Sequence, residues 1–157
     1  MWKTVLYFLL VSVSGLYLGC SAEAKDTVIN WHKYDDFSKW EFDCSYTKEN
    51  KMQKEFLDIL QQIRTTYGKP MPINSGYRDF THPIERGKLN RGKEVGAHTY
   101  GVAADIAVRG EDAMELFVIA FSYGIRRIGV YQRGQERFLH LDIGDRELNF
   151  PPALWTK

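Results

Sequence analysis

The stretch "GAHTYGVAADIAV", residues 96–108, places a histidine and a carboxylate close together at the start of an apolar run. His98 lies in a loop-like segment with glycine and threonine, and Asp105 lies inside residues 102–108, which have the composition of a buried strand. A buried carboxylate is costly unless it is paired, hydrogen-bonded or bound to a cation. We therefore expect Asp105 to have a partner elsewhere in the chain.

A second stretch, "RFLHLDIG" at residues 137–144, supplies candidates for that partner. Side chains alternate along a strand, so His140 and Asp142 share one face together with Phe138, and the intervening leucines and isoleucine form an apolar face. The apolar face belongs in the core. The face that carries His140 and Asp142 is therefore expected to contact polar groups outside the core.

His98, Asp105 and His140 together make a candidate metal site, because two imidazoles and one carboxylate with an open fourth position are typical of catalytic zinc. Taken singly, each residue has an ordinary alternative, namely a surface or core histidine or a salt-bridged aspartate. The H-x-D pattern also occurs in iron oxygenases, but their second histidine follows it, and none of the 4 histidines here follows Asp142.

Hydrophobic spacing and turn residues predict the remaining elements. A helix is expected over residues 50–67, ended by Gly68 and Pro70, and a long loop over residues 78–100, a length that in compact domains is usually functional. The other expected elements are strands at 71–74, 102–108, 128–131 and 137–143, a second helix at 113–123, and an irregular lead-in at 25–46 with a short extended piece. This order predicts an α+β fold.

The bulk composition excludes some classes of function. At 157 residues the chain is expected to hold one domain, and a net charge of +1 gives no electrostatic case for nucleic-acid binding. The 2 cysteines are Cys20 and Cys44, and Cys44 is expected to be a small buried hydrophobe rather than a nucleophile.

The first 24 residues are expected to be an export signal. The apolar run at 5–19 is short for a membrane span and suits a signal-peptide core. Two alternatives follow it: cleavage after Ala24, or a lipoprotein signal that ends before a lipidated Cys20. Residues 25–157 would then form the single mature domain, exported to the periplasm or cell envelope and touching a membrane only through its signal or lipid.

Four stretches together resemble a known family: "INSGYR" (73–78), "GAHTYGVAADIAV", "GIRRIGVYQ" (124–132) and "FLHLDIG" (138–144). In order and spacing they are similar to the zinc D-Ala-D-Ala carboxypeptidases and murein endopeptidases (peptidase M15-like, subfamily A). That resemblance implies the Hedgehog/DD-peptidase fold, a small, mostly antiparallel sheet with flanking helices.

The resemblance implies one Zn²⁺ per chain, held by His98, Asp105 and His140. It also implies that Arg78 grips a substrate carboxylate, for which a guanidinium fork is suited. A structural salt bridge is the alternative for Arg78. Tyr77 is a further candidate for substrate binding, and Tyr100 and Tyr131 are candidate rim residues.

The chain departs from the family at the catalytic base. Positions where relatives carry an acid or a histidine hold Arg137 and Phe138, neither of which accepts a proton. Asp142 is the favoured base because it shares the face of His140, and Glu136 is the second candidate. If Asp142 instead orients a ligand, the base is Glu136 or another group.

The resemblance implies a zinc peptidase that acts on peptidoglycan stem peptides or cross-links, as a D,D-carboxypeptidase or a murein endopeptidase. D-Ala-D-Ala, D,D or L,D cross-links and L-Ala-D-Glu all stay open as the bond cleaved. The alternative is an inactive zinc-containing module that binds cell wall or another partner. A purely structural zinc would need a fourth protein ligand, for which Cys44 and His82 are the only candidates.

Overall fold

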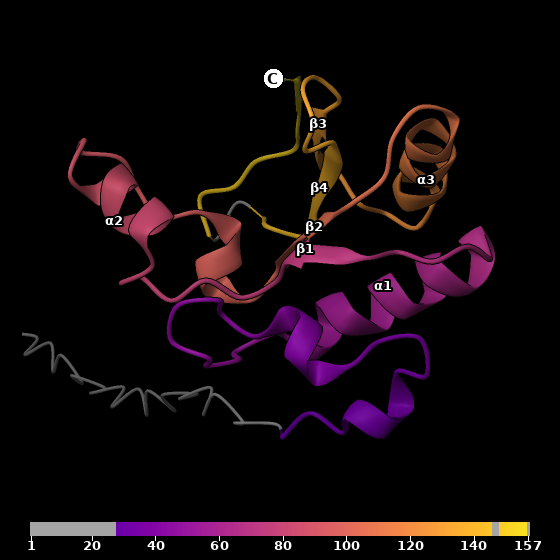
Figure 1. Ribbon diagram of the computed structural model, residues 1–157, viewed down its shortest axis with the longest axis horizontal. Helices are drawn as coiled ribbons and strands as arrows, with labels where there is room; N and C mark the ends of the chain where they lie inside the picture. Colours follow the sequence, from indigo (N-terminus) through magenta and orange to yellow (C-terminus); the bar gives the residue numbers. More distant parts are fainter. Residues whose placement is uncertain (1–27, 146–147, 157) are drawn as a thin grey trace, which may run out of the picture.

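The computed structural model describes residues 28–145 and 148–156, in which three helices precede the first strand and the last three strands follow one another (Figure 1). Three α-helices, three 3₁₀ helices and five strands occur in these residues. In chain order they are η1 (Trp31–Lys33), η2 (Lys39–Phe42), α1 (Lys54–Tyr67), β1 (Ile73–Ser75), α2 (Pro83–Leu89), η3 (Ala97–Tyr100), β2 (Ala103–Ile106), α3 (Glu111–Ser122), β3 (Arg127–Tyr131), β4 (Phe138–Asp142) and β5 (Ala153–Thr156).

The strands form one sheet in the order β1-β2-β4-β3-β5. The pairings β1–β2, β2–β4 and β3–β4 are antiparallel, and β5 joins the edge parallel to β3. The α+β class and the mostly antiparallel sheet are therefore confirmed. The register of the strands sets Asp105 opposite His140 and Arg127 opposite Asp142.

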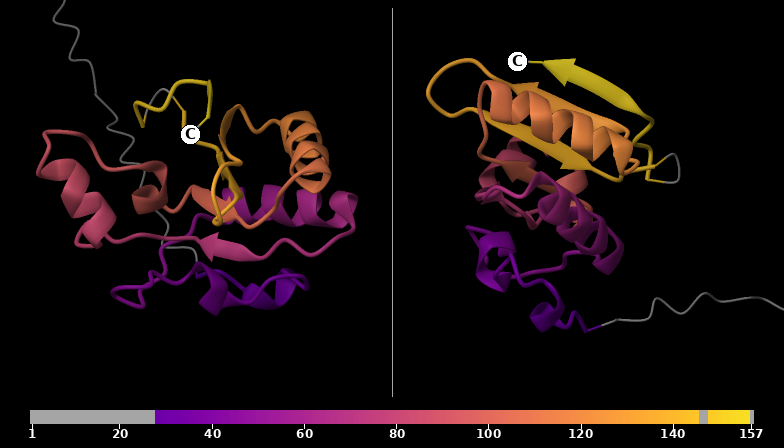
Figure 2. Two further views of the ribbon diagram at one scale, coloured as in Figure 1. Left: turned by 45° about the horizontal axis from the view of Figure 1, so that its top comes forward. Right: turned by 90° about the vertical axis from the view of Figure 1, so that its right-hand side faces the viewer.

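The two faces of the sheet have different roles. Helices α1 and α3 both lie on one side of it, whereas α2 and η3 lie towards the other (Figures 1 and 2). The strand residues that face the two long helices are apolar and buried in the main core; they include Ala104, Ile106, Ile128, Leu139 and Leu141. The polar residues of β2 and β4 are left to face the opposite side.

Helix α1 follows its sequence pattern closely. Phe56, Leu60 and Ile63 are fully buried at helical spacing, and the helix ends before Gly68 as expected. Helix α3 begins two residues earlier than predicted, at Glu111, because acidic residues are favourable in the first turn of a helix.

The segment expected to be a long loop contains a helix, α2, which corrects that prediction. His82 caps it by accepting from the Ile84 N–H, and Pro83 occupies its first position. Proline there is favoured because its fixed φ suits a helix start and its missing N–H would have had no helical partner. Its Glu85 is completely buried and binds both Lys88 and the Gly96 N–H.

Strand β5 was not expected, and the lead-in differs from its prediction. The described part of the lead-in holds the short helices η1 and η2 and no strand. Cys44 follows η2 and is buried, in agreement with its expected place in the core.

The predicted signal peptide, with Cys20, lies outside the described residues. Among the described helices, none combines the length and the apolar character that a membrane crossing requires.

Candidate metal centre

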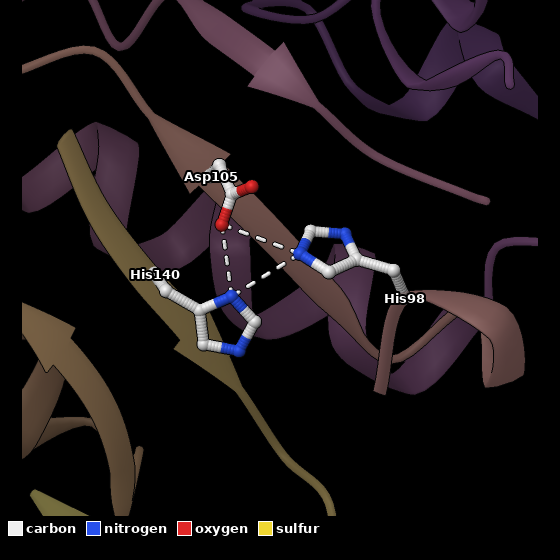
Figure 3. Close-up of side chains that lie close together, drawn as sticks. All are labelled: His98, Asp105 and His140. Atoms are coloured by element: carbon white, nitrogen blue, oxygen red, sulfur yellow. Dashed lines mark hydrogen bonds and ion pairs between the residues drawn. The ribbon is translucent and has the colours of Figure 1, made fainter. Parts of the chain in front are cut away.

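Three elements bring His98, Asp105 and His140 together, as Figure 3 shows. His98 comes from η3, and Asp105 and His140 lie opposite each other on β2 and β4. The Asp105 Oδ1 atom is 2.8 Å from His140 Nδ1 and 3.2 Å from His98 Nε2, and the two nitrogens are 3.2 Å apart. One donor atom from each residue therefore points at a common centre, as a metal site requires.

His98 is oriented by the backbone. Its Nδ1 lies 2.6 Å from the Gly76 carbonyl oxygen, which can only accept, so Nδ1 carries the hydrogen and Nε2 keeps its lone pair. In return, the Arg78 N–H donates to the His98 carbonyl at 3.2 Å. This pair of bonds joins the segment after β1 to η3 and aims Nε2 at the centre.

His140 is oriented by Asp142. The Asp142 Oδ2 atom lies 2.8 Å from His140 Nε2, so this carboxylate fixes the hydrogen on Nε2 and leaves the lone pair on Nδ1. The other oxygen of Asp142 accepts from the Gly144 N–H and from Arg127 Nε, both at 2.9 Å. Asp142 is fully buried, and its charge is compensated by Arg127.

The result is two nitrogen lone pairs and a carboxylate oxygen that converge in a buried place. His98 and Asp105 are 3% and 6% exposed. Burial lowers the pKa of His98, which keeps the imidazole neutral. Burial alone would raise the pKa of Asp105, but the two imidazoles hold it well below its usual range. Burial lowers the pKa of His140, but Asp105 and Asp142 raise it overall, so the three atoms hold either a shared proton or a metal cation between them, and this N₂O set suits zinc.

Arg78 lies beside the centre and is paired within the chain. Its Nη2 binds Asp105 Oδ2, the oxygen turned away from the histidines, and its Nε donates to Ser75 Oγ at 2.8 Å. This is the structural salt bridge that the sequence left open as the alternative. The predicted grip on a substrate carboxylate stays a prediction, and Arg78 does line the hollows beside the centre.

The two candidate bases lie in different surroundings. Asp142 sits on the Nε2 side of His140, opposite the ligating Nδ1, with both oxygens engaged by protein groups. This geometry favours the alternative in which Asp142 orients a ligand. Glu136 is exposed on the β3–β4 turn and lines one hollow together with Asp105 and Arg78.

The prediction that Tyr77 binds substrate is corrected by its position. Tyr77 is 3% exposed and packs in the main core, and its ring faces Lys51 rather than the centre. The Tyr77 N–H donates to the Phe42 carbonyl, which ties this segment to η2 and the main core.

Cys44 and His82 do not join the cluster. The Cys44 sulfur accepts from the Asp79 N–H, and His82 Nε2 lies 3.2 Å from Ser45 Oγ. Tyr131 lines the hollow beside the centre, and Tyr100 lines a separate hollow that none of the three centre residues lines.

Sequence reasoning missed two neighbours of the centre, Arg127 and Trp155. Arg127 could have been found from strand pairing, since it lies opposite Asp142 across the β3–β4 hairpin. Trp155 comes from β5, with its ring 5.4 Å from that of His140, and it donates to the Tyr131 hydroxyl at 3.0 Å. No spacing in the sequence connects this tryptophan to the histidines.

Comparison with known families agrees with this geometry. The sequence model described as Peptidase M15 matches residues 32–142, which include all three residues of the cluster. The chain therefore belongs to the Peptidase M15 family. A comparison with curated proteins found no match.

Proposed function

We propose that this chain is a zinc-dependent peptidase that hydrolyses peptide bonds in peptidoglycan stem peptides or cross-links. The observation that carries the proposal is the convergence of His98 Nε2, His140 Nδ1 and Asp105 Oδ1. The other nitrogen or oxygen of each side chain is hydrogen-bonded to another protein group. Histidines whose outer nitrogens are hydrogen-bonded in this way are typical of metal ligands. Membership of a peptidase family supports hydrolysis as the reaction.

The chain's own residues would prepare the site for this chemistry. A zinc ion at the centre supplies Lewis acidity, which makes water nucleophilic near neutral pH and polarises a carbonyl. Arg78 keeps one oxygen of Asp105 occupied, so that the other oxygen faces the centre. Asp142 and the Gly76 carbonyl keep both imidazoles in the tautomer that binds metal.

We propose Glu136 as the general base. It is the candidate that faces the hollow, and a carboxylate there takes a proton from the attacking water and passes it to the leaving amine. Asp142, which is buried and ion-paired with Arg127, instead positions His140.

Peptidoglycan as substrate also agrees with the predicted export signal, because this polymer lies outside the cytoplasmic membrane. The test is digestion of purified cross-linked peptidoglycan by the full chain, with products read by mass spectrometry, with zinc and with chelator. New fragments that disappear with chelator support the proposal. A folded, zinc-loaded protein that releases none refutes it and favours the inactive binding module.

Two variants test Glu136 as the general base. Glu136→Gln should lower kcat by about 10²–10⁴-fold while zinc stays bound, since that is the usual contribution of a general base. Glu111→Gln, on the first turn of α3, is the matched control and should leave kcat unchanged. Unaltered kcat in Glu136→Gln would reject Glu136 as the base.

A further inference from the structure

Helix α3 is apolar on nearly all sides. Its polar residues lie near its two ends, and apolar residues fill positions 116–121 without a break. One face of the helix is buried in the main core through Ala113, Leu116 and Ala120. A helix that is hydrophobic all round is normally buried all round. The face of α3 that the core leaves uncovered therefore calls for a second contact.

That uncovered face carries Met114, Val118 and Phe121, which follow one another at about one helical turn. Each is more than half exposed, and so is Leu154 of β5 beside them. Two hollows of about 280 Å³ each lie between α3 and β5, one beside Met114 and the other beside Phe121, and Phe117 and Leu154 line both. We call this surface the α3 stripe. It consists of projecting apolar side chains next to hollows that can receive such side chains.

Opposite charges stand at the two ends of the α3 stripe. Glu111, the first residue of α3, is exposed and shares the face of Val118 at helical spacing. At the other end, the Arg126 guanidinium lies 4.3 Å from the centre of the Phe121 ring and donates to the Phe121 carbonyl. Among the described residues, neither Glu111 nor Arg126 belongs to an ion pair. A stripe with an acid at one end and a cation at the other is complementary to a second copy of itself in the reverse direction.

We propose that two copies of this chain associate through the α3 stripe, with their α3 helices antiparallel about a two-fold axis at Val118. Met114 of each copy then enters the hollow beside Phe121 of the other copy, and Phe121 enters the hollow beside Met114. Glu111 of each copy faces Arg126 of the other. Such a contact uses the same surface on both copies, so it closes at a dimer.

The arrangement goes beyond the proposed peptidase function and is compatible with it. Helix α3 lies on one side of the sheet, whereas α2 and η3, which carries His98, lie towards the other (Figures 1 and 2). Association through the α3 stripe therefore leaves the metal centre open in both copies.

The size of the α3 stripe sets the expected strength of the dimer. The largest apolar patch of a monomer usually covers about 300–600 Å², which is less than the roughly 800 Å² that each partner buries in a standard interface. Interfaces of the smaller kind are typical of weak, transient association. We therefore expect a Kd of about 1–100 µM for the dimer.

Sedimentation equilibrium of the full chain, from about 1 µM to about 1 mM, brackets that affinity. Val118→Glu sets a carboxylate against its own copy at the two-fold axis and should raise the Kd at least about tenfold. Leu89→Glu replaces an exposed leucine of α2, and this matched control should leave the Kd unchanged. A chain that stays monomeric throughout would overturn the inference. So would a dimer that persists in Val118→Glu, because it would use another part of the chain.

An exchange of charges tests the antiparallel register. Glu111→Arg and Arg126→Glu each replace attraction by repulsion at two places in the dimer, so each should raise the Kd by about three- to tenfold. The double variant restores opposite charges and should return the Kd to within about twofold of the unaltered value. Glu55→Arg, in the first turn of α1, is the matched control and should change nothing.

Recovery of affinity in the double variant separates a direct contact from damage to the fold. The double variant carries both substitutions, so a loss of folding caused by either one would be retained in it. Thermal unfolding of each variant gives an independent measure of its stability. A double variant as weakly associated as the two single variants would overturn the antiparallel arrangement.

Discussion

Asparagine at position 142 would test how the centre is oriented, because it keeps the shape of Asp142 and removes its charge. Both oxygens of the carboxylate accept hydrogen bonds: Oδ1 accepts from Arg127 and the Gly144 N–H, and Oδ2 accepts from His140 Nε2. An asparagine has one acceptor oxygen, and we expect Arg127 and Gly144 to take it. The amide NH₂ then faces His140 Nε2 and moves the imidazole hydrogen to Nδ1, the atom that points at the centre.

The structure sets the size of two effects of this substitution, the loss of stability and the loss of zinc affinity. Breaking a buried ion pair by removing one partner costs about 3–5 kcal/mol. The Arg127 side chain is 15% exposed and asparagine keeps an acceptor, so we expect a loss near the lower end, about 3 kcal/mol. Loss of a group that orients a metal ligand typically weakens metal binding by about 10–100-fold. That range corresponds to about 1.4–2.7 kcal/mol.

Two assays read these effects separately. Denaturant unfolding in the presence of chelator gives the change in stability, and competition with a chromophoric chelator gives the zinc affinity. Asp35→Asn, an exposed aspartate in the lead-in, is the control and should change neither. If Asp142→Asn bound zinc like the unaltered chain but lost turnover, Asp142 would be the general base and the positioning role would be refuted.

Three further predictions concern backbone, charge and metal. Gly101→Ala should destabilise the fold far more than the control Gly124→Ala, by denaturant unfolding: both have positive φ, costing about 1–2 kcal/mol, but only at Gly101 would a Cβ lie 1.9 Å from the Lys51 carbonyl oxygen. Burial raises the Glu85 pKa, but Lys88 and the Gly96 N–H hold it below its ordinary 4.5. The unfolded chain therefore binds the proton more tightly, and stability should fall as pH drops below 4.5. Glu85→Gln should make that fall shallower, since the lowered pKa values of Asp58, Asp79 and Asp105 account for the rest, and an unchanged slope would contradict the prediction. Zinc at 100 times its Kd should stabilise the chain by about 2.7 kcal/mol, seen as a chelator-reversible rise in Tm, and calcium should give no rise.

The sequence predicted those parts of the fold whose residues repeat with a clear period. The long helices show helical spacing of buried residues, and β4 alternates strictly, so its two faces could be assigned from the order of its residues alone. Helix α2 was missed because its buried residue, Glu85, is charged while its apolar Ile84 and Leu89 are exposed, so no helical spacing of buried apolar residues marks it, although His82-Pro83 is a helix-start signal. Strand β5 is a short, half-exposed edge strand after two prolines, and only its pairing with β3 defines it.

The three metal-site residues could be proposed from the sequence because their chemistry is unusual in apolar surroundings. Their supporting groups could not. The Gly76 carbonyl has no sequence signature, and the pairing of Arg78 with Asp105 depends on how a loop after β1 lies against β2. Tyr77 was misassigned for a similar reason, since only the fold shows which way a residue after a glycine points.

The reciprocal bonds between the Gly76–Arg78 segment and His98 have a consequence for engineering. These bonds hold the two ends of segment 79–95 together, so the position of the ligand His98 does not depend on the length of that segment. Loop length itself is cheap, since each doubling costs only about 0.6 kcal/mol. This segment carries Ile84 and Lys88, which line the hollow beside the metal centre. With the buried Glu85 kept, the exposed positions of this segment can be exchanged, so that the recognition of substrate can be redesigned there while the metal ligands stay in place.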